Sequence, residues 1–163
     1  MRKVGEKKIE SCKDFPKFLG FGPNIGPCRK TLEKWGAKPG DRVVIAPHSK
    51  VEGLISKIPR GKLVTMKELC EGLARIYGVD FCCPLVAGIS VWLISNAAEE
   101  EAEKLGKEKV PYWRVLKTGG YLNEKYPGGA ERQKELLEEE GHAVVKKGKR
   151  WFVEDFEKSL FSF

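Results

Sequence analysis

Two adjacent thiols, Cys82 and Cys83, are the residues best suited to nucleophilic chemistry. They come just before a predicted helix, and the dipole at a helix N-terminus lowers the pKa of a nearby thiol, whose thiolate is the reactive form. No histidine stands close to them in the sequence. Two alternatives stay open: an enzyme that uses Cys82 or Cys83, and a pair of buried, inert thiols.

Metal and nucleotide sites are not indicated. His48 and His142 have no second ligand at a metal-binding spacing, and adjacent cysteines do not form a CxxC pair. The glycines of Gly20-Phe21-Gly22 are not followed by the helix and the Gly-Lys-Ser/Thr residues of a phosphate-binding loop. We therefore expect no metal and no cofactor.

The positive charge of the chain lies in its first third. The net charge is +7, and residues 1–58 carry 13 Lys and Arg against 6 Asp and Glu, whereas residues 59–163 carry 17 of each kind. A basic arm attached to a neutral body can bind a polyanion by neutralising its phosphates. The alternative is a solvated basic surface, and the same two interpretations apply to the basic cluster at 146–150.

The chain of 163 residues suits one well-packed domain with a small appendage. Its longest mainly apolar run, residues 81–98, contains polar residues and Pro84, so it predicts a buried helix rather than a membrane span. The charged start shows no secretory signal, and five irregularly spaced cysteines are typical of free thiols. We predict a soluble, cytoplasmic protein without a membrane partner.

Glycine and proline residues, which interrupt helices and strands, together with the spacing of apolar residues, predict the secondary structure of the first third of the chain. The first part of the chain is expected to be irregular, with a short helix over 27–35 and a strand over 42–46. Ser49 and Glu52 have the spacing of a capping box for a helix through Ser56. The sequence thus predicts a basic N-terminal arm over 1–48 and a compact domain over 49–163.

A helix pair is predicted in the middle of the chain. Thr65 and Glu68 have capping-box spacing for a helix through Tyr77, and a turn through Cys82 is expected to lead into a long helix over 85–105. Two helices joined by a short turn indicate a helix-turn-helix element.

The last part of the chain combines a loop, two further helices and a hairpin. We expect an ordered loop over 110–129, a helix over 130–140, a hairpin with strands over 142–145 and 150–153, and a terminal helix over 154–161. The predicted fold class is α+β, mainly helical, with small β-hairpins.

The order of motifs from residue 50 to residue 141 resembles the C-terminal DNA-binding domain of the alkylguanine-DNA alkyltransferases. The motifs that carry the resemblance are Ile58-Pro59-Arg60-Gly61, Val64-Thr65 with the helix pair, Val110-Pro111-Tyr112-Trp113-Arg114-Val115, Tyr126-Pro127-Gly128-Gly129 and Leu136-Leu137-Glu138-Glu139-Glu140-Gly141. The resemblance implies a winged helix-turn-helix domain that enters the minor groove and flips an alkylated guanine out of the duplex.

The acceptor of the alkyl group is missing from the matching frame. The family's Pro-Cys-His-Arg motif reads Pro111-Tyr112-Trp113-Arg114 here, so only Arg114 and, further on, Glu140 match. A phenol with a pKa of about 10 and no adjacent base is a poor nucleophile at neutral pH. We therefore expect no alkyl transfer, as in the alkyltransferase-like proteins, which bind alkylated bases without repairing them.

The residues expected to contact DNA also depart from the family. Met66 replaces the tyrosine that rotates a phosphate, and residues 76–103 contain no Lys or Arg. The expected DNA contacts are therefore the basic arm together with Arg60, Lys62, Thr65, Met66, Arg114 and Lys117. The resemblance places a base pocket at Tyr126, Pro127, Gly128 and Gly129 beside the aromatic loop. Alternatively, Trp113 and Tyr126 anchor the loop in the core and Arg114 pairs with a carboxylate.

A second hypothesis follows from the missing basic residues. The chain is then a protein interaction module on the same fold, which uses the apolar helix around Trp92 and the acidic residues of 99–103 to bind a protein partner or a second copy of itself.

Overall fold

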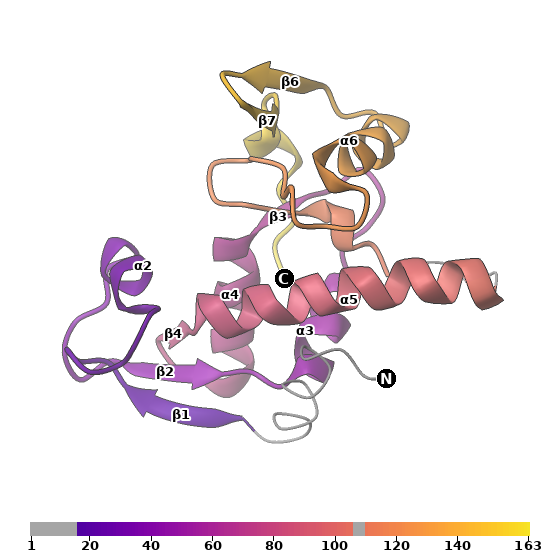
Figure 1. The fold of residues 1–163 in the computed structure, drawn as a ribbon. Coiled ribbons are helices and arrows are strands. Elements are labelled where there is room, and N and C mark those ends of the chain that lie inside the picture. The colour runs from indigo at the N-terminus through magenta and orange to yellow at the C-terminus, as the bar shows by residue number, and fades with distance from the viewer. Residues whose placement is uncertain (1–15, 106–109) are drawn as a thin grey trace.

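The computed structural model describes residues 16–105 and 110–163. This part of the chain has an α+β fold with five α-helices and three small sheets. Helix α5, Pro84–Leu105, crosses the middle of the molecule (Figure 1). The first sheet lies on one side of α5, and the C-terminal helix α6, Gly129–Glu139, lies on the other (Figure 1). Among the described residues, no helix has the length and apolar character needed to cross a membrane.

The first sheet combines strands that lie before and after residue 48, the predicted end of the N-terminal arm. Strand β2, Arg42–Ile45, pairs antiparallel with β1, Lys17–Gly20, and parallel with β4, Phe81–Cys82. The expected irregular start and the expected turn through Cys82 were therefore wrong, because both short strands are fixed by pairing with a distant partner. Residues 1–15 of the predicted arm lie outside the described residues, and the boundary at residue 48 stays a prediction.

Helix α2, Arg29–Lys34, confirms the short helix expected in this region. Its buried side chain Leu32 packs with Phe21 and Val43 under the first sheet. Cys28, before the helix, and Cys83, before α5, complete this small core. The described residues from Phe21 to Val43 are thus packed against the start of α5.

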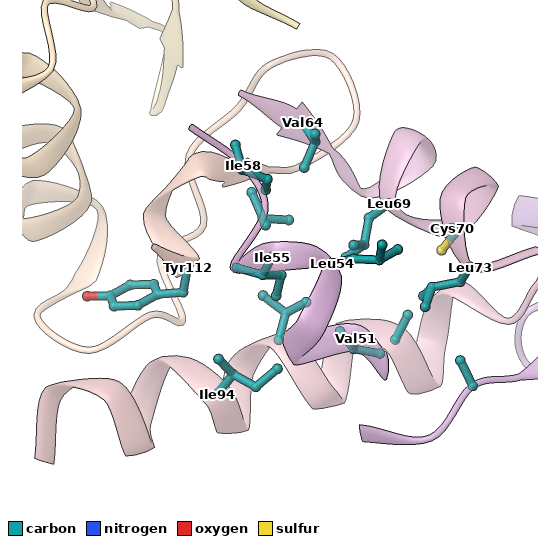
Figure 2. Packing of buried hydrophobic residues seen from close by; sticks show 14 of the residues in the cluster. Val51, Leu54, Ile55, Ile58, Val64, Leu69, Cys70, Leu73, Ile94 and Tyr112 are labelled. Atoms are coloured by element: carbon teal, nitrogen blue, oxygen red, sulfur yellow. The ribbon is translucent and has the colours of Figure 1, made fainter. Parts of the chain in front are cut away.

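Three helices enclose the main core. They are α3, His48–Ile55, α4, Met66–Tyr77, and α5, and their apolar faces meet at Leu54, Leu73 and Ile94 (Figure 2). The capping box of α4 is confirmed, since the Thr65 N–H donates to Glu68 Oε2 over 2.8 Å. The expected Ser49 cap of α3 was wrong, because Pro47 precedes the first helical residue and already has a φ near −65°.

The segment expected to be a loop over 110–129 contains two further elements. They are the 3-10 helix η1, Tyr112–Arg114, and strand β5, Val115–Leu116, which pairs parallel with β3, Val64–Thr65. Strand β5 is only two residues long and has no local sequence signal. It forms because it pairs with β3, which is distant in the sequence.

The hairpin beyond α6 is confirmed, with its strands at slightly different positions. Strands β6, Val144–Lys147, and β7, Arg150–Val153, are joined at Gly148 and Lys149, so two lysines expected in the turn belong to β6. The expected terminal helix is only the short 3-10 helix η2, Phe156–Ser159. Backbone hydrogen bonds tie the residues at and just after the end of η2 to Leu63. This pairing favours an extended chain there rather than a longer helix.

Candidate functional site

Tyr112, at the position expected for the acceptor, is fully buried. Its hydroxyl donates a hydrogen bond to Glu99 Oε1 over 2.6 Å, and its ring makes edge contacts with Trp113 and Tyr126. Burial, and then the hydrogen bond to Glu99, raise the pKa of the phenol above its ordinary value. Figure 2 shows the ring above α5, at the end of the cluster away from Cys70. Tyr112 is therefore a neutral packing residue at pH 7.

Trp113, Arg114 and Glu140 form one internal cluster. Trp113 Nε1 donates to Glu140 Oε2 over 2.9 Å, and Arg114 Nε donates to Glu140 Oε1 over 2.7 Å. A second Arg114 nitrogen donates to the carbonyl oxygen of Ile58 over 2.7 Å. The Glu140 side chain is 4% exposed and that of Arg114 is 13% exposed. The geometry thus agrees with the alternative in which Arg114 pairs with a carboxylate.

This cluster forms the floor of one pocket, here called the arginine pocket. It has a volume of about 670 Å³ and is lined by three arginines, Arg60, Arg114 and Arg132. Pro111 and Glu139 also line it, and Arg60 donates to the Glu139 carbonyl oxygen over 3.0 Å. The predicted loop residue Pro111 and the predicted contact Arg60 therefore lie together, on the α6 side of Tyr112.

A second pocket lies where the N-terminal ends of α4 and α5 meet the segment 116–126, and we call it the interhelical pocket. Its volume is about 460 Å³. Helix α2 supplies one wall, and the residues used below are Cys28, Thr31, Met66, Leu85, Lys117, Tyr126 and Arg150. Three predicted site residues meet here, namely Met66, Lys117 and Tyr126.

Of the four residues of the predicted base pocket at 126–129, one lines a pocket in the structure. Tyr126 lines the interhelical pocket, but its hydroxyl is buried and donates to the Val115 carbonyl oxygen over 3.0 Å. Burial raises the pKa of this phenol. Gly128 and Gly129 have positive φ values of 79° and 73° and form the turn into α6. Pro127, half-buried, belongs to the same turn.

The predicted DNA contacts are spread over the molecule. Lys62 is exposed after the turn at Gly61, and Thr65 is buried as the cap of α4. Lys117 forms an exposed ion pair with Glu124 at 3.0 Å. The structure therefore brings Lys117 and Met66 to one pocket and Arg60 and Arg114 to the other.

The cysteines of the described residues are buried and free. Cys28 lines the interhelical pocket, and burial, followed by its neighbour Cys83, raises the pKa of its thiol to about 11. At neutral pH the thiolate is then about one part in ten thousand. Cys82 and Cys83 fit the alternative of packed thiols. Among the described residues, no three His, Cys, Asp or Glu side chains are grouped as metal ligands.

Several residues of the interhelical pocket were not among the site residues predicted from the sequence. Helix α2 was assigned to the arm, and nothing local shows that Cys28 and Thr31 reach the start of α5. Leu85 lies in an apolar helix and is nevertheless 47% exposed. Arg150 belongs to the basic cluster at 146–150, which the sequence left as either a phosphate-binding surface or a solvated one. The absence of acidic residues in 142–153 was the one sequence feature that favoured binding.

No family model matches the chain, and no curated protein matches it. Solved structures do resemble it. One shows S. pombe Atl1 with damaged DNA containing O6-carboxymethylguanine, at 24% identity and a TM-score of 0.48 over 71% of this chain and 94% of that one. Another shows S. pombe ATL with DNA, at 24% identity and a TM-score of 0.47 over the same shares. Atl1 is an alkyltransferase-like protein, the group that the sequence motifs resemble.

Proposed function

We propose that the protein binds DNA as a non-enzymatic, alkyltransferase-like protein and accepts an extrahelical, alkylated guanine in the interhelical pocket. The observation that carries this proposal is the pocket itself. Its volume of about 460 Å³ falls in the range of small-molecule sites, and Met66, Leu85 and Tyr126 offer it apolar and aromatic surface. Lys117 and Arg150 place two cations at its edge, where phosphates flank a flipped base.

The elements around the pocket support the finer interpretation as a winged helix-turn-helix. Helices α4 and α5 contact each other and are joined through β4, and their N-terminal ends both reach the pocket. The hairpin β6–β7 reaches the same pocket through Arg150 and has the position of a wing.

The acidic residues of α5 do not oppose DNA at this place. Leu85 lies in the first turn of α5, and Glu99 lies fourteen residues later. With a rise of 1.5 Å per residue, the two are about 21 Å apart. This separation is more than twice the Debye length of about 8 Å at physiological salt, so the acidic end is screened from a phosphate at the pocket.

The nucleophilic side chains near the interhelical pocket explain why the protein would bind an alkylated base without accepting its alkyl group. Tyr112 is enclosed and bonded to Glu99, so its oxygen does not face the pocket. Cys28 does line the pocket, but its raised pKa keeps the thiol protonated at neutral pH. A pocket that can hold the base therefore has no competent acceptor.

Fluorescence anisotropy with labelled duplexes tests this function. We expect binding that weakens as salt rises and that favours a duplex with one O6-alkylguanine over the unmodified duplex. T31W, in the α2 wall, should fill the pocket and abolish the preference while the salt-dependent binding stays. S49W, on the exposed start of α3, is the matched control and should behave as the wild type.

Two results would contradict the proposal. Absence of salt-dependent binding to either duplex would refute DNA binding, and an unchanged preference in T31W would show that the base is not held in the interhelical pocket. Mass spectrometry after incubation with the alkylated duplex should show an unmodified chain; a mass increase of one alkyl group would refute recognition without transfer.

One observation favours the protein interaction module as a second candidate. Leu85 and Trp92 are seven residues apart, on one side of α5, and are 47% and 38% exposed. Trp92 is partly fixed, because its Nε1 donates to the Lys125 carbonyl oxygen over 3.0 Å. Light scattering distinguishes the candidates: self-association that L85E abolishes supports the module, and a monomer that binds DNA contradicts it.

A further inference from the structure

The hairpin β6–β7 displays a basic surface beside the interhelical pocket. Residues 142–153 contain four basic residues and no Asp or Glu, and all four are exposed. Lys147 and Arg150 are partners in the register of the two strands, so they lie on the same face of the hairpin. Phe152 shares this face because it is two residues beyond Arg150. Lys149 is in the turn between the strands. We call Lys147, Lys149 and Arg150 the wing face.

Aromatic rings hold two of these cations in place. The Arg150 guanidinium lies 3.7 Å from the centroid of the Tyr121 ring, and Lys147 Nζ lies 5.9 Å from that of Phe152. The two rings are 6.0 Å apart and form one support under the cations. Flexible basic side chains lose freedom when they bind a ligand, and side chains that already rest on rings lose less. The wing face is therefore prepared for an anionic partner.

The charges of the wing face are not neutralised by neighbours. Within residues 16–105 and 110–163, none of its three side chains forms an ion pair with a carboxylate. Lys117, which also lines the interhelical pocket, is paired with Glu124. The stronger uncompensated charge therefore lies on the hairpin side.

Arg150 connects this surface to the pocket, because it belongs to the wing face and also lines the interhelical pocket. We propose that the wing face binds the phosphates of the DNA strand that leaves the base held in the pocket. This inference rests on the proposed function and adds to it the surface that fixes the backbone.

The salt dependence of binding measures these contacts directly. Each phosphate that a protein neutralises contributes about 0.9 to the slope of log K against log salt concentration. Three contacts contribute about 2.7, which corresponds to an affinity change on the order of 100-fold at 0.15 M salt. We expect K147Q/K149Q/R150Q to show this loss of slope and of affinity.

Three comparisons make the experiment specific. K50Q/K57Q/K104Q removes the same charge from exposed lysines on α3, after it and on the end of α5, and should lower the slope by less than one unit. K147R/K149R/R150K keeps all charges and should keep the wild-type slope. Thermal unfolding of each variant should agree with the wild type, since the substituted side chains are exposed.

The possible outcomes separate this inference from the proposed function. A wild-type slope in K147Q/K149Q/R150Q, or an equal loss in the α3 and α5 control, would overturn the wing face and leave the pocket intact. A wild-type protein that binds neither duplex would refute the proposed function as well. Retained preference for O6-alkylguanine together with the reduced slope would support both.

Discussion

Glu140 connects three parts of the chain through its two carboxylate oxygens. They accept hydrogen bonds from Trp113 and Arg114 of η1, and Arg114 in turn donates to the carbonyl of Ile58. Because the carboxylate and the guanidinium are both mostly buried, each supplies the partner that makes the burial of the other acceptable. The matching Arg and Glu of the family motif thus have a structural use here that does not depend on an acceptor cysteine.

E140Q tests this use. The substitution keeps the shape but leaves the Arg114 charge without its counter-charge, so we expect a loss of about 3 kcal/mol in the free energy of unfolding. E135Q is the matched control, because Glu135 forms an exposed ion pair with Arg132, and it should change stability by less than about 0.5 kcal/mol. Urea titrations give both values. Equal midpoints for the two variants would contradict a structural role for the internal pair.

At the scale of elements, the segment between β5 and α6 is held against η2. Gly120 has a φ of +84°, and a Cβ at this position would lie 2.4 Å from the Phe156 ring. The Gly120 carbonyl also accepts a hydrogen bond from the Val153 N–H over 3.0 Å. The pocket residues that follow are therefore positioned by a close backbone approach that only glycine permits.

G120A and G61A separate the two costs of an added methyl group. Both glycines have a φ of +84°, but nothing lies within 4 Å of a Cβ at Gly61. We expect about 1 kcal/mol of destabilisation for G61A from the left-handed backbone, and about 1–3 kcal/mol more for G120A from overpacking. Chemical denaturation measures the difference. If G120A is no worse than G61A, the 116–129 segment is not held by Phe156.

The elements with local signals were predictable from the sequence, and those with distant partners were not. Thr65, Glu68 and Gly78 define α4, and the positions of Pro84 and Gly148 define the start of α5 and the hairpin turn. Strands β4 and β5 are two residues long, and only pairing with β2 and β3 makes them strands. The motif Pro111–Arg114 and Glu140 were selected from the sequence, and the structure brings Trp113, Arg114 and Glu140 into contact. The interhelical pocket was missed because α2 and Arg150 approach it from the two ends of the chain.

At the scale of the whole molecule, both histidines of the sequence are partly buried in the folded state. His48 Nδ1 and His142 Nε2 have no hydrogen-bond partner within the described residues. Burial lowers the pKa of both rings, against weaker opposite effects of Glu52 and Glu140. Each ring is therefore held in its neutral form, and a proton on it favours the unfolded chain.

Stability should consequently fall as the pH is lowered through the region around 6.5. In the unfolded chain a histidine binds a proton near pH 6.5, whereas the folded rings bind it only at lower pH. Between these values the unfolded state binds more protons, so the free energy of unfolding decreases as pH falls and is fully retained above pH 7.5. Urea midpoints between pH 8 and pH 5.5 measure the effect. H48Q/H142Q should flatten the curve, and an unchanged slope in that variant would assign the loss to other groups.

The parallel pairing of β2 with β4 also matters while the chain is being synthesised. Translation delivers β1, α2 and β2 first, yet the third strand of their sheet emerges only after α3, β3 and α4 have been made. Until then the free edge of β2 has its backbone amides and carbonyls available to any other extended peptide. The early part of the nascent polypeptide therefore depends on its own later residues to close a surface that would otherwise invite intermolecular association.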